Sequence, residues 1–168
     1  MKLFSSLLVT KKDEEIALLL SNVNIFKNLT PNERIKIAKY FREKHYKSGE
    51  RIVKEGEAGD RMFIISQGAV KVTKFLSETE EEVLANLVDG DLFGEMALLD
   101  GSPRSASVIA ISPVKMFELY RVSLEEFIEK EPRIGVKVLH NLAKIMAERI
   151  RAAGDKIRDI LIWKSIKS

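Results

Sequence analysis

Apolar residues recur at helical spacing in the first part of the chain. Asp13–Leu20 is an apolar run behind an acidic start. A second helix is predicted to open at Thr30, where the following proline suits a first turn and Glu33 can close a capping box. Apolar positions then continue at helical spacing through Phe41. The pattern predicts that residues 1–48 are helical.

From His45 to about Arg121 the pattern changes to short β-rich runs, most of them separated by glycine or proline. Seven of the nine glycines lie between Gly49 and Gly101. Closely spaced short strands with turn signals between them predict an all-β barrel or sandwich. The predicted strands are Met62–Ile65, Ala69–Thr73, Glu82–Ala85, Ser107–Ala110 and Lys115–Leu119.

The last part of the chain returns to a helical pattern. Ser123 and Glu126 have the spacing of a second capping box, which predicts a short helix to about Glu131, and Pro132 marks a break or a new first turn. Beyond it, apolar residues recur three and four positions apart, as in a coiled coil. Packing on the chain's own strands and pairing with the same helix of a second subunit both fit this stripe. Its members are Leu139, Leu142, Met146, Ile150, Ala153, Ile157 and Ile160.

Length and composition restrict the class of protein. With 168 residues, the chain is long enough for one domain with a helical appendage. The absence of cysteine excludes disulfides, thiolate metal sites and cysteine nucleophiles, and it fits a reducing cytoplasm. The longest apolar runs, such as Ile16–Leu20, are far shorter than the roughly 20 residues of a membrane-spanning helix. We therefore expect a cytoplasmic protein with no membrane span.

The net charge of +3 is unevenly distributed along the chain. Residues 1–132 contain 19 basic and 22 acidic side chains, whereas residues 133–168 contain 9 basic and 3 acidic ones. A basic segment of this kind is typical either of contact with nucleic acid or an acidic surface, or of a solvated helix face.

One arginine stands out in the strand-rich region. Phe75–Val114 contains eight acidic residues and a single basic one, Arg104. A salt bridge to a nearby carboxylate is one interpretation of Arg104. Binding of phosphate is the other, because small residues follow at Ser105–Ser107 and a short helix over Phe93–Leu99 would present its N-terminus to an anion. Glu95, close to that anion, would then accept hydrogen bonds from hydroxyl groups, so the residues indicate a phosphosugar site.

Two runs in this region, Phe93–Leu98 and Pro103–Val108, resemble the phosphate-binding cassette of cyclic nucleotide-binding domains. These domains occur in the catabolite activator protein, in the regulatory subunits of cyclic-nucleotide-dependent kinases and in cyclic-nucleotide-gated channels. The resemblance extends over roughly residues 26–155. Further matching blocks, in the same order as in the family, are Tyr46–Glu50, Glu55–Asp60, Phe63–Ile65, Gly68–Val72 and Gly90–Asp91.

The resemblance implies a fold and a set of site residues. The fold is mainly β with flanking helices: a double-stranded β-helix, or jelly-roll barrel, with N-terminal helices and a long C-terminal helix. Glu95 would accept from the ribose 2′-hydroxyl, and Arg104 would pair with the cyclic phosphate. The implied ligand-binding residues are Gly94, Glu95, Met96, Ala97, Arg104, Ser105 and Ala106. The implied turn glycines, with a structural role only, are Gly49, Gly56, Gly59, Gly68 and Gly90.

The base contacts are less clearly implied. The family's long helix closes over the purine, and this chain departs from the catabolite activator protein around Ala153–Asp155. Asp155 is a candidate to accept from an adenine amino group, or else a solvated helix charge. Ser105 favours cyclic AMP by resemblance to the catabolite activator protein, with cyclic GMP as the other candidate. No cofactor and no metal are expected.

We therefore expect a non-enzymatic sensor that binds a cyclic nucleotide and passes the signal through its last helix to an unidentified output protein. His45 and His140 lie in different elements and form no catalytic constellation. The predicted division is an N-terminal helical extension (1–24), the binding domain (25–131), and a C-terminal lid and dimerisation helix (132–168). A homodimer would form through residues 133–162.

Two other functions remain open from the sequence. One is a transcription regulator of the catabolite activator type without its DNA-binding domain, and the other is a jelly-roll pocket for a different small ligand. The six residues Trp163–Ser168 are too few for a helix-turn-helix, so no direct DNA binding is expected.

Overall fold

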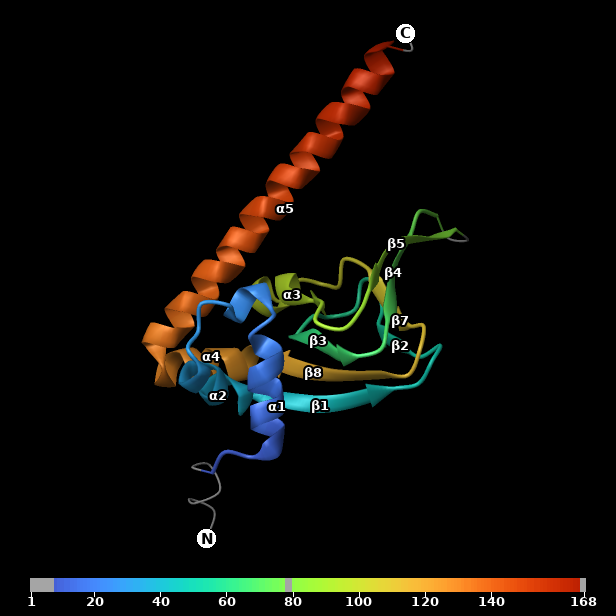
Figure 1. The fold of residues 1–168 in the computed structure, drawn as a ribbon. Helices are drawn as coiled ribbons and strands as arrows, with labels where there is room; N and C mark the ends of the chain where they lie inside the picture. The colour runs from blue at the N-terminus through green and yellow to red at the C-terminus, as the bar shows by residue number, and fades with distance from the viewer. Residues whose placement is uncertain (1–7, 78–79, 167–168) are drawn as a thin grey trace.

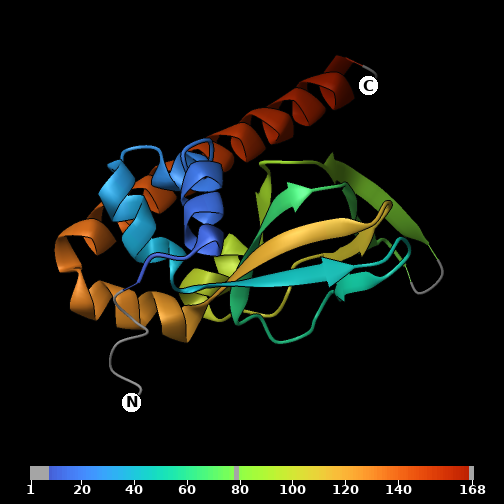
Figure 2. The same cartoon turned by 60° about the horizontal axis from the view of Figure 1, so that its bottom comes forward.

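The structure, a computed structural model, describes residues 8–77 and 80–166 (Figure 1). Residues 1–7 of the predicted N-terminal extension and 167–168 of the last segment lie outside the described residues. Most helices gather at one end of the strands, and the last helix extends far beyond both (Figures 1 and 2). The helices are α1 (Lys11–Leu20), the 3₁₀ helix η1 (Asn24–Phe26), α2 (Pro31–Ala38), α3 (Glu95–Asp100), α4 (Arg121–Lys130) and α5 (Pro132–Ile166).

The strands form two antiparallel four-stranded sheets. The order in one sheet is β1-β8-β3-β6 and in the other β2-β7-β4-β5. Among the described residues no ladder joins the two sheets, so the expected jelly-roll barrel is not closed. At one edge of each sheet the strand is short, with three residues in β2 and two in β6, and offers few backbone groups for such a ladder. The strands are β1 (Phe41–Tyr46), β2 (Arg51–Val53), β3 (Arg61–Gln67), β4 (Val70–Phe75), β5 (Glu81–Leu87), β6 (Leu92–Phe93), β7 (Ser107–Ala110) and β8 (Val114–Tyr120).

Strands β3 and β8 of the β1-β8-β3-β6 sheet are buried on both faces. Phe63 and Met116 point into the core between the two sheets, whereas Ile64 and Phe117 point into a second core beneath the helices. This two-sided burial explains why Met62–Ile65 is a continuous apolar run rather than an alternating one. The five strands predicted from the sequence correspond to β3, β4, β5, β7 and β8, except that β4 begins at Val70 and not at Ala69.

The prediction that residues 1–48 are helical is wrong from Phe41 onward. Phe41 begins β1, which pairs antiparallel with β8 from Phe41↔Leu119 to Tyr46↔Val114. Phe41 is buried at a spacing from Ile37 that also suits a helix, so the local pattern could not separate the two structures. The capping box at Thr30 is confirmed, because its hydroxyl accepts from the Glu33 N–H and the Glu33 carboxylate accepts from the Thr30 N–H.

Helix α1 belongs to the same core as the binding domain. Ile16 and Leu20 are fully buried together with Phe117 of β8 and Phe127 of α4. The described part of the predicted N-terminal extension therefore packs against the strands.

The predicted capping box at Ser123 is wrong. Helix α4 begins at Arg121 directly after β8, with Tyr120 at the N-cap and no side-chain cap, so Ser123 lies inside the helix. The Arg121 N–H instead donates to the Asp60 carbonyl at 2.8 Å, which fixes the helix start from a distant loop. The break at Pro132 is confirmed, since α5 begins there.

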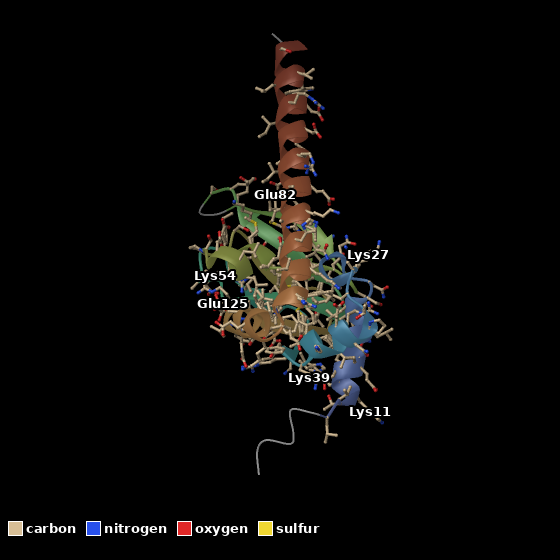
Figure 3. All side chains as sticks on the ribbon, turned by 90° about the vertical axis from the view of Figure 1, so that its left-hand side faces the viewer. Lys11, Lys27, Lys39, Lys54, Glu82 and Glu125 are labelled. Atoms are coloured by element: carbon tan, nitrogen blue, oxygen red, sulfur yellow. The ribbon has the colours of Figure 1, made fainter. Side chains whose placement is uncertain are left out.

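Helix α5 has a buried beginning and an exposed end. Ile134, Val138 and Leu142 pack into the helical core, whereas Ile150 is 73% exposed and Ile157 is 59% exposed. The side chains of the second half point outward around the helix as it leaves the body (Figure 3). Packing on the chain's own domain therefore accounts for only the first part of the apolar stripe. No helix in the described part of the chain is long and apolar enough to cross a membrane.

Candidate functional site

The short helix α3 is held between two glycines in the left-handed conformation. Gly94, with a φ of +80°, is its N-cap, and Gly101, with a φ of +68°, is its C-cap. The Gly101 N–H donates to the Ala97 carbonyl at 3.0 Å. Gly94 is required for a second reason, because a Cβ atom there would lie 2.6 Å from Nη1 of Arg104. The backbone at the start of α3 thus lies directly against the arginine side chain.

A cavity of about 240 Å³ opens beside α3, just below the range of about 300–1,000 Å³ that is typical of ligand pockets. All seven ligand-binding residues implied by the resemblance line it: Gly94, Glu95, Met96, Ala97, Arg104, Ser105 and Ala106. The rest of the wall is mainly apolar and comes from both sheets, with Val53, Val72, Leu87, Leu92, Phe93 and Val108. The polar groups and the apolar wall together suit a small ligand that has one charged and one apolar part.

Arg104 is buried at the edge of this cavity. Its Nη1 donates to the Arg61 carbonyl at 2.8 Å, and its Cζ lies 5.6 Å from the centre of the Phe63 ring. Its Nη2 is 3.9 Å from Oδ1 of Asp60, which is an ion-pair distance but longer than a hydrogen bond. Both interpretations of Arg104 therefore have support, because a loose ion pair leaves N–H donors for an anion. Burial lowers the pKa of the Arg104 guanidinium below its ordinary value.

A partly buried polar network extends from Arg104 into the sheet. Arg61 donates from Nε to Asp60 at 3.0 Å, and its Nη1 lies 3.4 Å from Oε2 of Glu118. Glu118 is fully buried and accepts from the hydroxyls of Tyr46 and Tyr120, at 3.0 and 3.2 Å. Burial, and then the Glu118 charge, raise the pKa of the Tyr46 hydroxyl well above its ordinary value. No local sequence pattern predicts this network, because its members come from β1, β3, β8 and the loop before β3.

Glu95 is also buried, and its carboxylate has a partner that the sequence analysis missed. Arg149 of α5 donates from Nη1 to Oε1 of Glu95 and lines the same cavity. The two residues are 54 positions apart, so no local motif connects them. The long helix therefore reaches the cavity through a charged side chain.

Two other predicted residues are placed differently from the rest. Asp155 is exposed, is not part of the cavity wall, and its Oδ1 pairs with Nη2 of Arg158 at 3.2 Å. Its role as a base contact stays a prediction that this arrangement does not support. The other four predicted turn glycines have positive φ values, whereas Gly59 does not. Gly59 is constrained by space instead, because a Cβ atom there would lie 2.2 Å from Cβ of Ala97. Its small size lets the loop before β3 pack on α3.

The charged side chains of the cavity are suited to binding different parts of a ligand. The described residues contain no group of three or more histidine, aspartate or glutamate side chains that could hold a metal ion. Arg104 presents a planar guanidinium suited to phosphate, and Glu95 presents a carboxylate suited to hydroxyl groups. The two charged groups and the apolar wall match the phosphate, the sugar and the base of a nucleotide.

Comparisons with known proteins identify the family of this chain. The family model of the cyclic nucleotide-binding domain matches residues 43–131, a range that contains all of α3 and Arg104. The cyclic AMP receptor protein of Thermus thermophilus is 32% identical over 144 residues, which are 86% of this chain and 64% of that protein. The cGMP-dependent protein kinase isozyme 1 of Drosophila melanogaster is 41% identical over 112 residues, which are 65% of this chain and 15% of the kinase. The chain thus spans less than two thirds of each of these two relatives.

A solved structure is similar over most of the chain. The crystal structure of a cyclic nucleotide-binding domain from Methylobacillus flagellatus matches with a TM-score of 0.76 and 29% identity. The match covers 88% of this chain and 83% of that one. Since the family model matches residues 43–131, which are more than half of the chain, this chain belongs to the cyclic nucleotide-binding domain family.

Proposed function

We propose that this chain is a sensor that binds cyclic AMP in the cavity beside α3 and transmits binding through α5 to a partner protein. The observation that carries the proposal is the cavity itself, in which buried Arg104 and buried Glu95 stand beside an apolar wall. Arg104 would bind the cyclic phosphate, and Glu95 would accept from the ribose 2′-hydroxyl. The chain would carry out no reaction of its own and would act in the cytoplasm.

Ser105 and the name of the Thermus thermophilus relative support cyclic AMP as the ligand. Cyclic GMP is the second candidate, because a cGMP-dependent kinase is also similar to this chain. Side chains in the cavity wall offer the base mostly apolar contact. Hydrogen bonds distinguish adenine from guanine through their different donor and acceptor edges, so a mainly apolar wall predicts modest selectivity.

Isothermal titration of nucleotide-free protein with cyclic AMP and cyclic GMP tests the proposal. We expect saturable binding of cyclic AMP, and Arg104→Met should weaken it about 10- to 100-fold, as expected for the loss of a hydrogen bond to a charged group. Arg51→Met, at an exposed arginine outside the cavity wall, is the matched control and should bind like wild type. Absence of heat with both nucleotides would refute the proposed function.

The exposed part of α5 supports a homodimer as a further part of this proposal. Ile150, Ile157 and Leu161 are more than half exposed, and an apolar helix face of this kind gains stability by pairing with a second copy. Light scattering at micromolar concentration should give the mass of a dimer, and Ile157→Asp should reduce it toward that of a monomer. Arg151→Ala, off the apolar face, should leave the mass unchanged. A monomeric wild type would contradict pairing through α5.

A further inference from the structure

Two arginines share one carboxylate beside the cavity. Oδ1 of Asp60 accepts from Nε of Arg61 at 3.0 Å, whereas it lies 3.9 Å from Nη2 of Arg104. The first distance is that of a hydrogen bond, and the second is too long for one. The carboxylate is therefore bound to Arg61, which is not part of the cavity wall, and is only loosely paired with Arg104, which is part of it.

Arg61 is held in place by groups of the sheet. Its Nη1 donates to the hydroxyl of Tyr120 and lies 3.4 Å from Oε2 of the fully buried Glu118. Its Cζ lies 4.7 Å from the centre of the Tyr120 ring. A buried carboxylate is costly unless a cation lies close to it, so Glu118 favours the position that Arg61 occupies. The guanidinium of Arg61 is thus fixed between the sheet and the Asp60 carboxylate.

The position of the Asp60 carboxylate determines how much of Arg104 is left for a ligand. Nη1 of Arg104 already donates to the Arg61 carbonyl, so Nη2 and Nε are the main donors left for a phosphate. The Asp60 side chain is 55% exposed, and without Arg61 it has room to turn toward Arg104. A close ion pair between Asp60 and Arg104 would occupy these donors, and an anionic ligand would have to break that pair before it could bind.

We propose that Arg61 is a positioning residue that holds the Asp60 carboxylate away from Arg104 and so leaves Nη2 of Arg104 for the phosphate of the nucleotide. The proposal rests on the proposed function, since that function assigns Arg104 to the phosphate. Arg61 acts through Asp60, so its effect on nucleotide affinity must depend on the Asp60 carboxylate. A residue that only stabilised the sheet would show no such dependence.

The test is a double-mutant cycle of Arg61→Met and Asp60→Asn, measured by isothermal titration with cyclic AMP. Arg61→Met should weaken binding about tenfold, because Asp60 then pairs closely with Arg104. Asp60→Asn should bind at least as tightly as wild type, because the amide carries no negative charge. In the Asp60→Asn background, Arg61→Met should change the affinity less than about twofold. Arg61→Lys keeps a cation for Asp60 and should restore most of the affinity.

The buried Glu118 requires a second background. Arg61→Met leaves this carboxylate without its cation, and a buried charge that loses its partner destabilises a protein strongly. Glu118→Gln removes the charge and keeps an acceptor for the hydroxyls of Tyr46 and Tyr120. The same cycle is therefore also measured in Glu118→Gln protein, where the same dependence on Asp60 is expected. Thermal melts identify the variants that are folded at the temperature of the titration.

Arg42→Met is the matched control. Arg42 is exposed, its Cζ lies 4.9 Å from the centre of the same Tyr120 ring, and it is not part of the cavity wall. The variant removes a cation from that ring and leaves the hydrogen bond between Arg61 and Asp60 in place. It should bind cyclic AMP like wild type.

The outcomes separate this inference from the proposed function. Equal weakening by Arg61→Met with aspartate and with asparagine at position 60 would overturn the positioning role, and so would an unchanged affinity of Arg61→Met. Weaker binding by Asp60→Asn would also overturn it, because Asp60 would then support Arg104 instead of competing with the phosphate. If wild type binds neither cyclic AMP nor cyclic GMP, the proposed function itself fails. If wild type binds only cyclic GMP, the same cycle applies with that ligand.

Discussion

Replacement of Gly94 by alanine would press a methyl group against the guanidinium that we assign to the phosphate. The new Cβ atom would lie 2.6 Å from Nη1 of Arg104 and 3.0 Å from the carbonyl oxygen of Arg61. These two atoms are joined by a 2.8 Å hydrogen bond, so the methyl group would displace the bond that orients the arginine. Alanine would also hold a φ of +80°, which costs about 1 kcal/mol in stability.

Gly90→Ala is the control that separates backbone strain from displacement of Arg104. Its φ is +87°, close to that of Gly94, but no atom lies within 4 Å of the Cβ that an alanine would add. Gly90→Ala should therefore lose about 1 kcal/mol of stability through backbone strain alone. Gly94→Ala should lose that amount and, in addition, bind cyclic AMP about tenfold more weakly, because Arg104 is moved from its place.

Two measurements on each variant are sufficient. Urea unfolding followed by far-ultraviolet circular dichroism gives the stability, and isothermal titration gives the affinity for cyclic AMP. The single tryptophan, Trp163, lies near the end of α5 and would report poorly on the sheets. If Gly94→Ala binds as tightly as Gly90→Ala, then either Arg104 does not bind the phosphate or its orientation does not matter.

Three further predictions concern stability and are measured by urea unfolding. Thr30→Ala should lower the free energy of unfolding by about 1 kcal/mol, because it removes a formed capping box. Ser123→Ala, inside α4, should change it by less than about 0.5 kcal/mol. A larger loss for Ser123→Ala than for Thr30→Ala would contradict the observed starts of α2 and α4. Tyr46→Phe should cost about 1–3 kcal/mol at pH 8 through its lost bond to Glu118. The pKa of Tyr46 is raised in the folded protein, so wild type loses stability as the pH rises above about 10. Tyr46→Phe lacks the hydroxyl and does not show this loss. The difference in free energy of unfolding between wild type and Tyr46→Phe should therefore narrow by about 1 kcal/mol at pH 11, and an unchanged difference would refute the raised pKa of Tyr46. Leu142→Ala should cost about 2–5 kcal/mol, and a cost near zero would show that α5 does not pack on the domain.

Local sequence signals predicted those elements whose structure is determined locally. The capping box at Thr30 formed where the pattern placed it, and Pro132 begins α5. At Ser123 the same type of signal failed, because the end of β8 and a hydrogen bond from Arg121 to the distant Asp60 carbonyl determine where α4 begins. The strand at Phe41 was missed for a similar reason, since its partner in β8 is more than 70 residues away.

In the candidate site, too, the sequence predicted the residues that lie close together in the chain and missed those that come from distant elements. Glu95 and Arg104 lie nine residues apart around one short helix, so a single stretch of sequence contains both, and both line the cavity. Arg149 and Glu118 become visible only when distant elements are brought together, and each carries a charge whose partner no spacing rule could identify. Asp155 is exposed and paired with Arg158, as expected for the solvated helix charge that was the other interpretation of this residue, and its role as a base contact stays a prediction.

The acidic segment around the cavity and the basic helix α5 are in contact at Glu95. The segment around the cavity is acidic, the surplus of basic residues lies in α5, and Arg149 is the residue through which that surplus reaches a buried carboxylate. Under the proposed function, a partner that binds α5 and draws Arg149 away from Glu95 changes the affinity of the cavity for the nucleotide. Thermodynamic linkage then requires the nucleotide to change the affinity for that partner by the same factor. The effect of Arg149→Met on cyclic AMP affinity therefore measures how much this contact contributes to the transmitted signal.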